Sequence, residues 1–136
     1  MRPVHRPPAA PPLRWRPLWT GIGVALMLFT LWMALRPDPG VTLAVPAGDK
    51  LLHAFTFAVL SGWWGNVYPG LRARRLAALG CLLFGVFIEL AQWLDPPRDA
   101  DALDVLADAA GIALALVLLR TPLGRVLAGV ERLVGR

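Results

Sequence analysis

The residues that could do chemistry in this chain lie at helical spacing within otherwise apolar sequence. The stretch DKLLHAFTF brings Asp49, Lys50 and His53 to one side of a predicted helix, because residues three and four apart are neighbours on a helix surface. The stretch GVFIELAQ does the same for Glu89 and Gln92. Ionisable side chains are costly in such surroundings, so we interpret them as a functional site or a paired network.

A third stretch, RDADALDVLADAAG, repeats aspartates at intervals of three and four residues, at Asp101, Asp104 and Asp108. In combination with these carboxylates, His53 and Glu89 could act as general acid and base. No nucleophilic side chain is expected at the same depth, so a hydrolytic enzyme would need water as its nucleophile. A single histidine with two acids forms a thin ligand set, so we expect no metal and no other cofactor.

The segments that must position these groups have the length and composition of membrane-spanning helices. Hydrophobic residues make up 57% of the 136-residue chain, more than in a typical soluble domain. Four apolar runs are each close to the roughly 20 residues that a helix needs to cross a bilayer. They are residues 17–35, 51–71, 76–94 and 102–119. The sequence therefore predicts an all-α fold, a four-transmembrane-helix bundle with an amphipathic C-terminal tail.

The charged residues predict how these helices cross the membrane. If the N-terminus is cytoplasmic, all 14 Lys and Arg residues lie on the inner side except Arg36, Lys50 and Arg98. All nine acidic residues except Glu131 then lie towards the outer side. This positive-inside pattern predicts a multi-pass protein of a bacterial-type cytoplasmic (inner) membrane, with both termini cytoplasmic. The net charge of +5 is then a topology signal and gives no reason to expect a nucleic-acid partner.

Composition divides the chain into three parts. Residues 1–16 are rich in proline and arginine and are expected to form a disordered cytoplasmic arm. Residues 17–120 form the predicted membrane domain. Residues 121–136 should lie on the inner membrane surface as an amphipathic helix, with Thr121 as its N-cap and Pro122 in its first turn. The apolar face of this tail comprises Leu123, Val126, Leu127, Val130, Leu133 and Val134.

Small residues at every fourth position mark faces on which two of the predicted helices should pack. Such residues allow helix backbones to approach closely in lipid. They are Ala77, Cys81 and Gly85 in the third run and Ala107, Gly111 and Ala115 in the fourth. The first series continues to Glu89, which places this carboxylate at a helix contact and not towards lipid.

The three polar stretches should meet near the outer face. A rise of 1.5 Å per residue places His53, Glu89 and Asp104 each about 5–8 Å inside the outer end of its predicted helix. The predicted polar pocket contains Asp49, Lys50, His53, Glu89, Gln92, Arg98, Asp104 and Asp108. In this pocket Lys50 and Arg98 could clamp a phosphate or carboxylate head group.

In this order and on successive predicted helices, the three stretches resemble the VanZ-like family of small membrane proteins. The matching positions are Asp49, Lys50 and His53, then Glu89 and Gln92, then Arg98, Asp104 and Gly111. Asp108 departs from the family pattern, which usually has asparagine there. The family is named for an accessory protein of glycopeptide resistance that lowers sensitivity to teicoplanin. The resemblance therefore implies a cell-envelope or antibiotic-response role.

The sequence leaves three interpretations of the polar residues open. One is a non-enzymatic binding or relay module, whose partner is a membrane lipid, a lipid-linked envelope compound or a glycopeptide. The second is a membrane enzyme acting on a lipid or lipid-linked envelope substrate, with Glu89 and His53 as acid and base. The third is a buried ion-pair network that only fixes the helix register. The oligomeric state, including a homo-oligomer, is left open as well.

Overall fold

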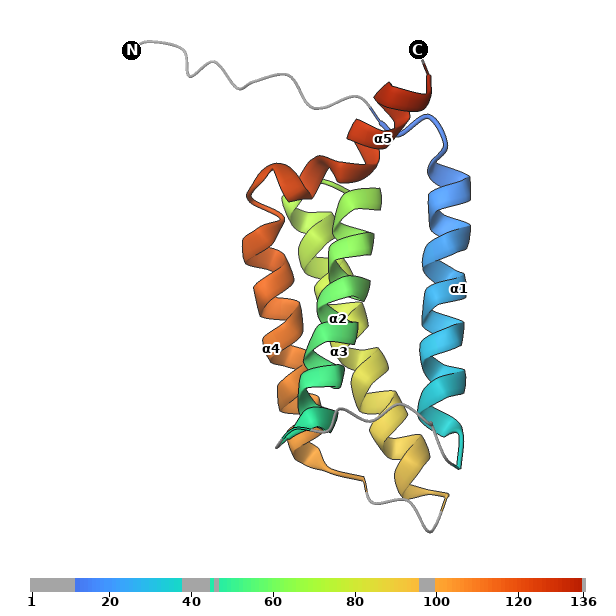
Figure 1. Cartoon of the computed structure of the whole chain (residues 1–136), viewed down its shortest axis with the longest axis vertical. Helices are drawn as coiled ribbons and strands as arrows, with labels where there is room; N and C mark the ends of the chain where they lie inside the picture. The colour runs from blue at the N-terminus through green and yellow to red at the C-terminus, as the bar shows by residue number, and fades with distance from the viewer. Residues whose placement is uncertain (1–11, 38–44, 46, 96–99, 136) are drawn as a thin grey trace, which may run out of the picture.

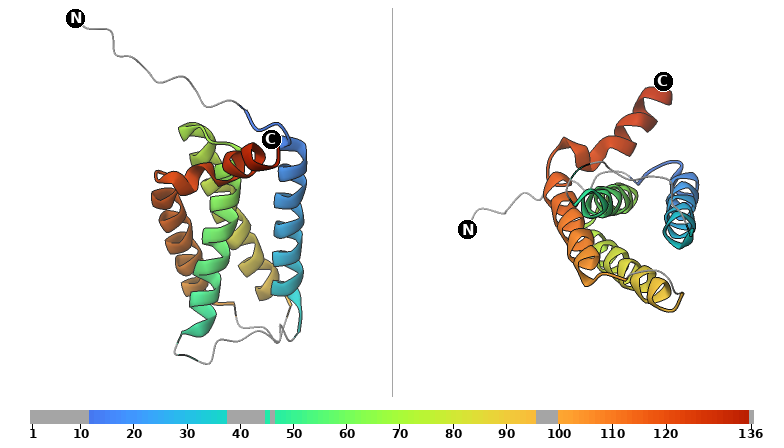
Figure 2. Two further views of the ribbon diagram at one scale, coloured as in Figure 1. Left: turned by 45° about the horizontal axis from the view of Figure 1, so that its top comes forward. Right: turned by 60° about the horizontal axis from the view of Figure 1, so that its bottom comes forward.

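Four long helices form the body of the protein in the computed structural model, which describes residues 12–37, 45, 47–95 and 100–135. They are α1 (Arg16–Leu35), α2 (Gly48–Val67), α3 (Leu71–Trp93) and α4 (Ala102–Leu118), and they run along the long axis of the molecule (Figure 1). A short 3-10 helix, η1 (Pro122–Arg125), then leads into α5 (Val126–Val134), which crosses one end of the bundle (Figure 2). No strand occurs among the described residues, so the all-α prediction is confirmed.

Two of these helices are individually long and apolar enough to cross a membrane. They are α1 and α3, whose most apolar stretches have mean hydropathies of 1.9 and 1.8. A third span results if α4 and the segment Pro122–Val134, which are bent by 81° relative to each other, are counted as one. α2 has 20 residues, but Asp49, Lys50 and His53 in its first two turns lower its hydropathy. The prediction of four spans is therefore supported in part.

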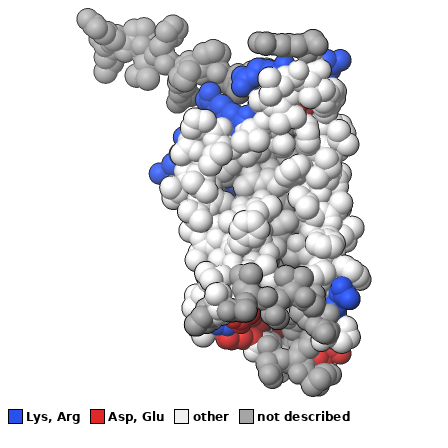
Figure 3. All heavy atoms as spheres, viewed as in Figure 1, with Lys and Arg blue, Asp and Glu red and all other residues white. Residues whose placement is uncertain are grey.

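The outward faces of the long helices are apolar. Large hydrophobic side chains are more than half exposed on each of them, for example Phe29 on α1, Phe55 on α2, Leu83 on α3 and Leu106 on α4. Such an extended apolar surface is rare on a soluble monomer and suits contact with lipid. Figure 3 shows a nearly uncharged band between basic residues at the end that carries α5 and acidic residues at the opposite end. We call these the basic end and the acidic end.

α2 contacts every other helix described and packs most extensively against α4. Phe57 of α2, Ile88 of α3 and Ile112 of α4 meet in the core between them. Gly111 of α4 lies directly against the backbone carbonyl oxygen of Ala54 in α2, where a Cβ atom would collide with that oxygen. This glycine therefore sets how closely α2 and α4 approach each other.

The small residues predicted to mark helix contacts differ in how deeply they are buried. Four of them, Cys81, Gly85, Gly111 and Ala115, are buried, and the other two, Ala77 and Ala107, are half-buried. The helix ends differ more from the prediction. α3 begins at Leu71 and not near residue 76, so the three arginines that follow Leu71 belong to the helix itself.

Arg74 joins three helices at the basic end. Its guanidinium group donates hydrogen bonds to the carbonyl oxygens of Gly65 at 3.0 Å, Leu119 at 2.8 Å and Gly124 at 2.9 Å. Carbonyl groups in the last turn of a helix lack partners within that helix. Arg74 therefore caps the ends of α2 and α4 and ties them to η1.

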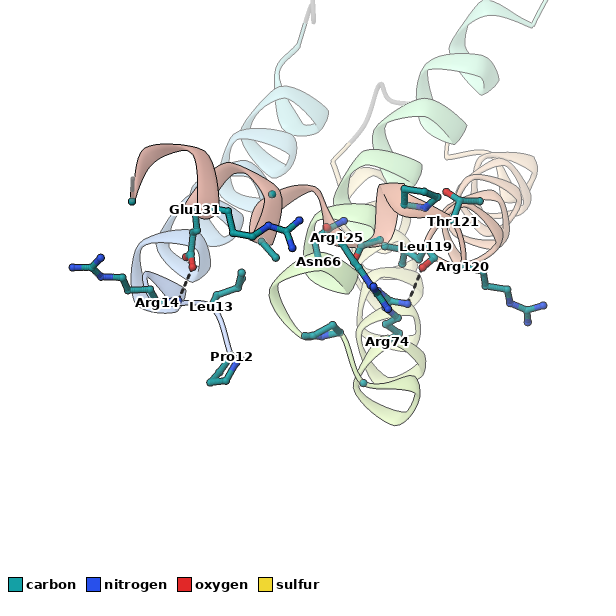
Figure 4. A pocket seen from close by; sticks show the side chains of 18 residues that line it. Pro12, Leu13, Arg14, Asn66, Arg74, Leu119, Arg120, Thr121, Arg125 and Glu131 are labelled. Atoms are coloured by element: carbon teal, nitrogen blue, oxygen red, sulfur yellow. Dashed lines mark hydrogen bonds between the residues drawn. The ribbon is translucent and has the colours of Figure 1, made fainter. Parts of the chain in front are cut away.

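Glu131 of α5 caps the start of α1. Its carboxylate accepts hydrogen bonds from the backbone N–H groups of Arg14 at 2.6 Å and Trp15 at 2.8 Å, and from the indole of Trp19 at 2.7 Å. The first N–H groups of a helix also lack internal partners, and the positive end of the helix dipole favours a carboxylate. Figure 4 shows the Glu131 side chain directed towards Arg14.

The C-terminal tail forms helix as predicted, but only part of its apolar face packs on the bundle. Thr121 accepts a hydrogen bond from the Leu123 N–H group as the predicted N-cap, although the first turn is a 3-10 helix. In α5, Leu127 is buried, whereas Leu133 and Val134 are 75% and 62% exposed. The C-terminal part of this face is therefore exposed and does not pack on the bundle.

The close contact at Gly111 predicts a specific sensitivity to added volume. Gly111→Ala should lower the melting temperature of the detergent-purified protein by several degrees, because overpacking a tight contact costs about 1–3 kcal/mol. The matched control is Gly80→Ala in α3, where a new Cβ has nothing within 4 Å. This control should leave the melting temperature unchanged or slightly higher. Equal effects of the two substitutions would show that α2 and α4 do not pack at this distance.

The contacts of Glu131 predict a pH-dependent contribution to stability. Desolvation raises the pKa of Glu131, but the hydrogen bonds from Trp15, Trp19 and Arg14 outweigh it, so the pKa lies below the usual 4.5. The stabilisation is therefore complete above pH 4.5 and is lost as the pH falls through the lowered value. Glu131→Gln should lower the melting temperature at pH 7, and the difference from wild type should shrink below pH 4.5. A difference that is constant with pH would contradict this assignment.

Candidate functional site

Lys50 forms the centre of an ion-pair network at the acidic end. Its ammonium group donates to Asp101 Oδ2 at 2.7 Å, to Asp104 Oδ1 at 2.8 Å and to Asp49 Oδ2 at 3.1 Å. A lysine has three N–H donors, and all three are used here. Lys50 therefore has no donor left for the phosphate or carboxylate head group that the sequence suggested it could clamp.

His53 lies one turn further along α2 and contacts two aspartates of α4. Its Nδ1 atom is 2.9 Å from Asp108 Oδ1, and its Nε2 atom is 3.5 Å from Asp104 Oδ2. The first distance is that of a good hydrogen bond, and the second is at the limit of one. If the neutral ring carries its proton on Nδ1 and donates a hydrogen bond to Asp108, its lone pair is on Nε2, which faces Asp104.

Glu89 brings a carboxylate of α3 to the same place. Its Oε2 atom accepts a hydrogen bond from the backbone N–H group of Asp101 at 3.0 Å, and its Oε1 atom is buried without a partner among the described residues. Asp108 Oδ2 is also buried without a described partner, and a Cβ atom at Gly85 would collide with it. Unpartnered buried carboxylate oxygens are costly, so a proton or a cation is expected to compensate them.

Asp101 links all three helices. Its Oδ1 atom accepts a hydrogen bond from the Leu103 N–H group at 2.9 Å, so Asp101 is the N-cap of α4. Its Oδ2 atom binds Lys50 of α2, while its backbone N–H group binds Glu89 of α3. The hydrogen bonds from Lys50 and Leu103 hold the pKa of Asp101 below its ordinary value, so this residue stays ionised.

The polar cluster, as we call these residues, is acidic and partly buried. It consists of Asp49, Lys50, His53, Glu89, Asp101, Asp104 and Asp108. Glu89, Asp104 and Asp108 are only 8%, 9% and 1% exposed. Because carboxylates outnumber the ammonium and imidazole groups, the cluster suits a proton or a cation better than an anion. His53, Glu89 and Asp104 each offer a potential metal-ligand atom within 4.8 Å of the other two.

Three residues of the predicted pocket do not belong to its buried part as the structure describes it. Gln92 donates a hydrogen bond to the carbonyl oxygen of Ala34 at 3.0 Å, so its amide faces the end of α1. Arg98 lies outside the described residues. Asp49 is at the rim, where its side chain is 65% exposed. The buried part of the cluster therefore comes from α2, α3 and the start of α4.

A cavity of about 1570 Å³ lies at the basic end, where several arginines line it. In Figure 4, Arg14 and Arg120 extend away from the cavity on opposite sides, while Arg74 donates to the carbonyl group of Leu119. The polar groups of this cavity thus mainly hold helix ends together, as Glu131 does. We therefore take the polar cluster as the candidate functional site.

The similarity of this chain to known proteins lies at the level of a family. A family model described as VanZ/LLP1 matches residues 12–125, a range that contains the four long helices and the whole polar cluster. No curated protein and no solved structure matches the chain. The match extends beyond the three motifs that first suggested the resemblance, and it covers most of the sequence. The chain belongs to the VanZ/LLP1 family.

Proposed function

We propose that the protein crosses a bacterial-type cytoplasmic membrane four times, with both termini in the cytoplasm and the polar cluster near the outer face. The two candidate spans α1 and α3, the family assignment and the apolar outer surface support a membrane location. The separation of basic and acidic ends supports the orientation (Figure 3). In this arrangement α2 also crosses the membrane, as the second of the four spans, and α4 shields its polar first turns from lipid.

We propose further that the protein has a cell-envelope or glycopeptide-response role, exerted through the polar cluster. The observation that carries this proposal is the convergence of ionisable side chains from three helices at one end of an apolar bundle. Two buried carboxylate oxygens without described partners, on Glu89 and Asp108, make a purely structural network an incomplete account. The ligand would be a lipid, a lipid-linked envelope compound or a glycopeptide that reaches the outer face.

A membrane enzyme acting on a lipid-linked envelope substrate is the second candidate function. Its support is the proximity of Glu89 and His53, which could act as acid and base on a water molecule. A test for turnover distinguishes binding from catalysis. Purified protein incubated with a lipid-linked pyrophosphate would convert it to a new compound only if the protein is an enzyme.

The proposed orientation predicts the result of reporter fusions at two exposed turns. A reporter active only outside the membrane should work when fused after Pro37, which follows α1. A reporter active only in the cytoplasm should work after Pro69, between α2 and α3. Activity of the same reporter at both positions would exclude the proposed topology.

The proposed role predicts a phenotype that depends on the polar cluster. Expression of the wild-type chain in a sensitive bacterial host should raise the inhibitory concentration of teicoplanin, and Glu89→Gln or Asp104→Asn should remove most of this protection. Arg120→Gln is the control, because it removes an exposed charge at the opposite end of the bundle. Immunoblots of membrane fractions must show equal amounts of each variant. Unchanged protection by the two cluster variants would argue that the cluster has no part in the phenotype.

A further inference from the structure

Three side chains of the polar cluster each have one polar atom held by a neighbour and another atom without a strong partner. Asp104 gives Oδ1 to Lys50 at 2.8 Å, whereas among the described residues its Oδ2 atom has the 3.5 Å contact with His53 and no closer ion pair. Glu89 gives Oε2 to the Asp101 N–H group, whereas its Oε1 atom is buried without a described partner. His53 gives Nδ1 to Asp108, which leaves Nε2. Each side chain is thus oriented, with one ligand atom to spare.

The spacing of these three side chains is close to that of ligands on one metal ion. A ligand atom from each of His53, Glu89 and Asp104 lies within 4.8 Å of the others. Nitrogen and oxygen ligands bind zinc at about 2.0–2.2 Å, so two ligands of one ion are no more than about 4.4 Å apart. Around a four-coordinate ion the ligand atoms are closer still, about 3.3–3.6 Å apart, so side-chain movements of up to about an ångström would bring the three groups into coordination distance.

The pairing of His53 with Asp108 is the arrangement that surrounds many metal-binding histidines. A histidine ligand usually donates its second ring N–H group to a carboxylate or carbonyl oxygen, which fixes the tautomer and makes the ligand more basic. Here Asp108, at 1% exposure, occupies that place behind the ring at 2.9 Å. This gives the buried carboxylate of α4 a role as a positioning residue.

The charges of the cluster also favour a cation. Lys50 neutralises part of the acidic charge, but it binds Asp101 Oδ2 and Asp104 Oδ1 and makes no hydrogen bond to Asp104 Oδ2. Glu89 and Asp108 contribute further buried carboxylates with oxygen atoms that no described group satisfies. A divalent ion would compensate these oxygens, whereas an anion would add to the repulsion.

We propose that His53, Glu89 and Asp104 bind a divalent transition-metal ion of the zinc or manganese class, with Asp108 positioning the histidine. One imidazole with two carboxylates is a ligand set that such ions accept, and three protein ligands leave a coordination position for water or a ligand oxygen. The sequence argued against a metal because it gave only a thin set of ligands. The structure adds the oriented histidine and the unpartnered glutamate oxygen. This site stands on the geometry of the cluster and does not require the proposed envelope role.

The test is a titration of the untagged, full-length protein in detergent after treatment with a chelator. Zn²⁺ and Mn²⁺ are added alone, and binding is followed by calorimetry and by elemental analysis after gel filtration. We expect one ion per chain and a higher melting temperature, because an ion that binds only the folded state stabilises it. If neither ion binds stoichiometrically to the wild type at micromolar concentrations, the proposal is overturned.

Matched variants locate the site. His53→Gln and Glu89→Gln should each weaken binding by more than about 100-fold, while Asp108→Ala should weaken it by about 10–100-fold, as expected for a residue behind a ligand. Asp108→Asn should weaken it less, since the amide oxygen can still accept the Nδ1 proton. His5→Ala and Cys81→Ala are controls for the other histidine and for the single thiol of the chain, and both should bind like wild type. Circular dichroism checks that each variant is folded.

Two further results decide the matter if a ligand variant does not fold. The visible absorption of Co²⁺ bound to the wild type should show nitrogen and oxygen ligands and no thiolate band. It should also change in Asp108→Asn, which alters the hydrogen bond of the histidine without removing a ligand. A thiolate band, or loss of binding in His5→Ala or Cys81→Ala, would place the ion elsewhere and refute the proposed site.

Discussion

The bundle depends on compensation of the carboxylates that it carries into an apolar interior. Lys50 of α2 binds Asp101 and Asp104 at the start of α4. The backbone N–H group of Asp101 in turn binds Glu89 of α3. An ion-pair network of this kind contributes little net stability compared with apolar packing, because its charged groups lose part of their hydration. The network is thus a poor way to gain stability but an effective way to hold three helix ends in one register. A fixed register is what a binding or catalytic site requires.

Small residues in the helix contacts make this network geometrically feasible. Gly111 allows the backbone of α4 to reach the carbonyl group of Ala54, one residue beyond His53 on α2. Gly85 leaves the space that the Asp108 carboxylate occupies beside α3. A larger side chain at Gly111 would push α2 and α4 apart, and one at Gly85 would displace the Asp108 carboxylate, so either change would disturb the hydrogen bond between His53 and Asp108. Close packing and the polar cluster therefore depend on the same backbone distances.

Periodicity in the sequence was enough to predict which residues share a helix face, and so the helices and most of the cluster follow from it. It could not predict which neighbour each face meets. Gln92 lies three residues after Glu89, yet α3 contacts α1 as well as α2 and α4, and Gln92 faces α1. The backbone hydrogen bond of Asp101 and the joining roles of Arg74 and Glu131 also depend on tertiary contacts. Glu131 did carry one signal, since it is the single acidic residue among the basic ones predicted for the inner side.

The aspartate at position 108 has a physical consequence that asparagine would lack. Either residue can accept the Nδ1 proton of His53 with one oxygen, so the orientation of the ring does not require a carboxylate. The second oxygen of Asp108 is buried near Gly85 without a described partner, on the side of α3 that also carries Glu89. This chain thus adds negative charge to a cluster that is already acidic. The added charge increases the affinity of the cluster for any positive species, whether it is a proton or a metal ion bound to His53.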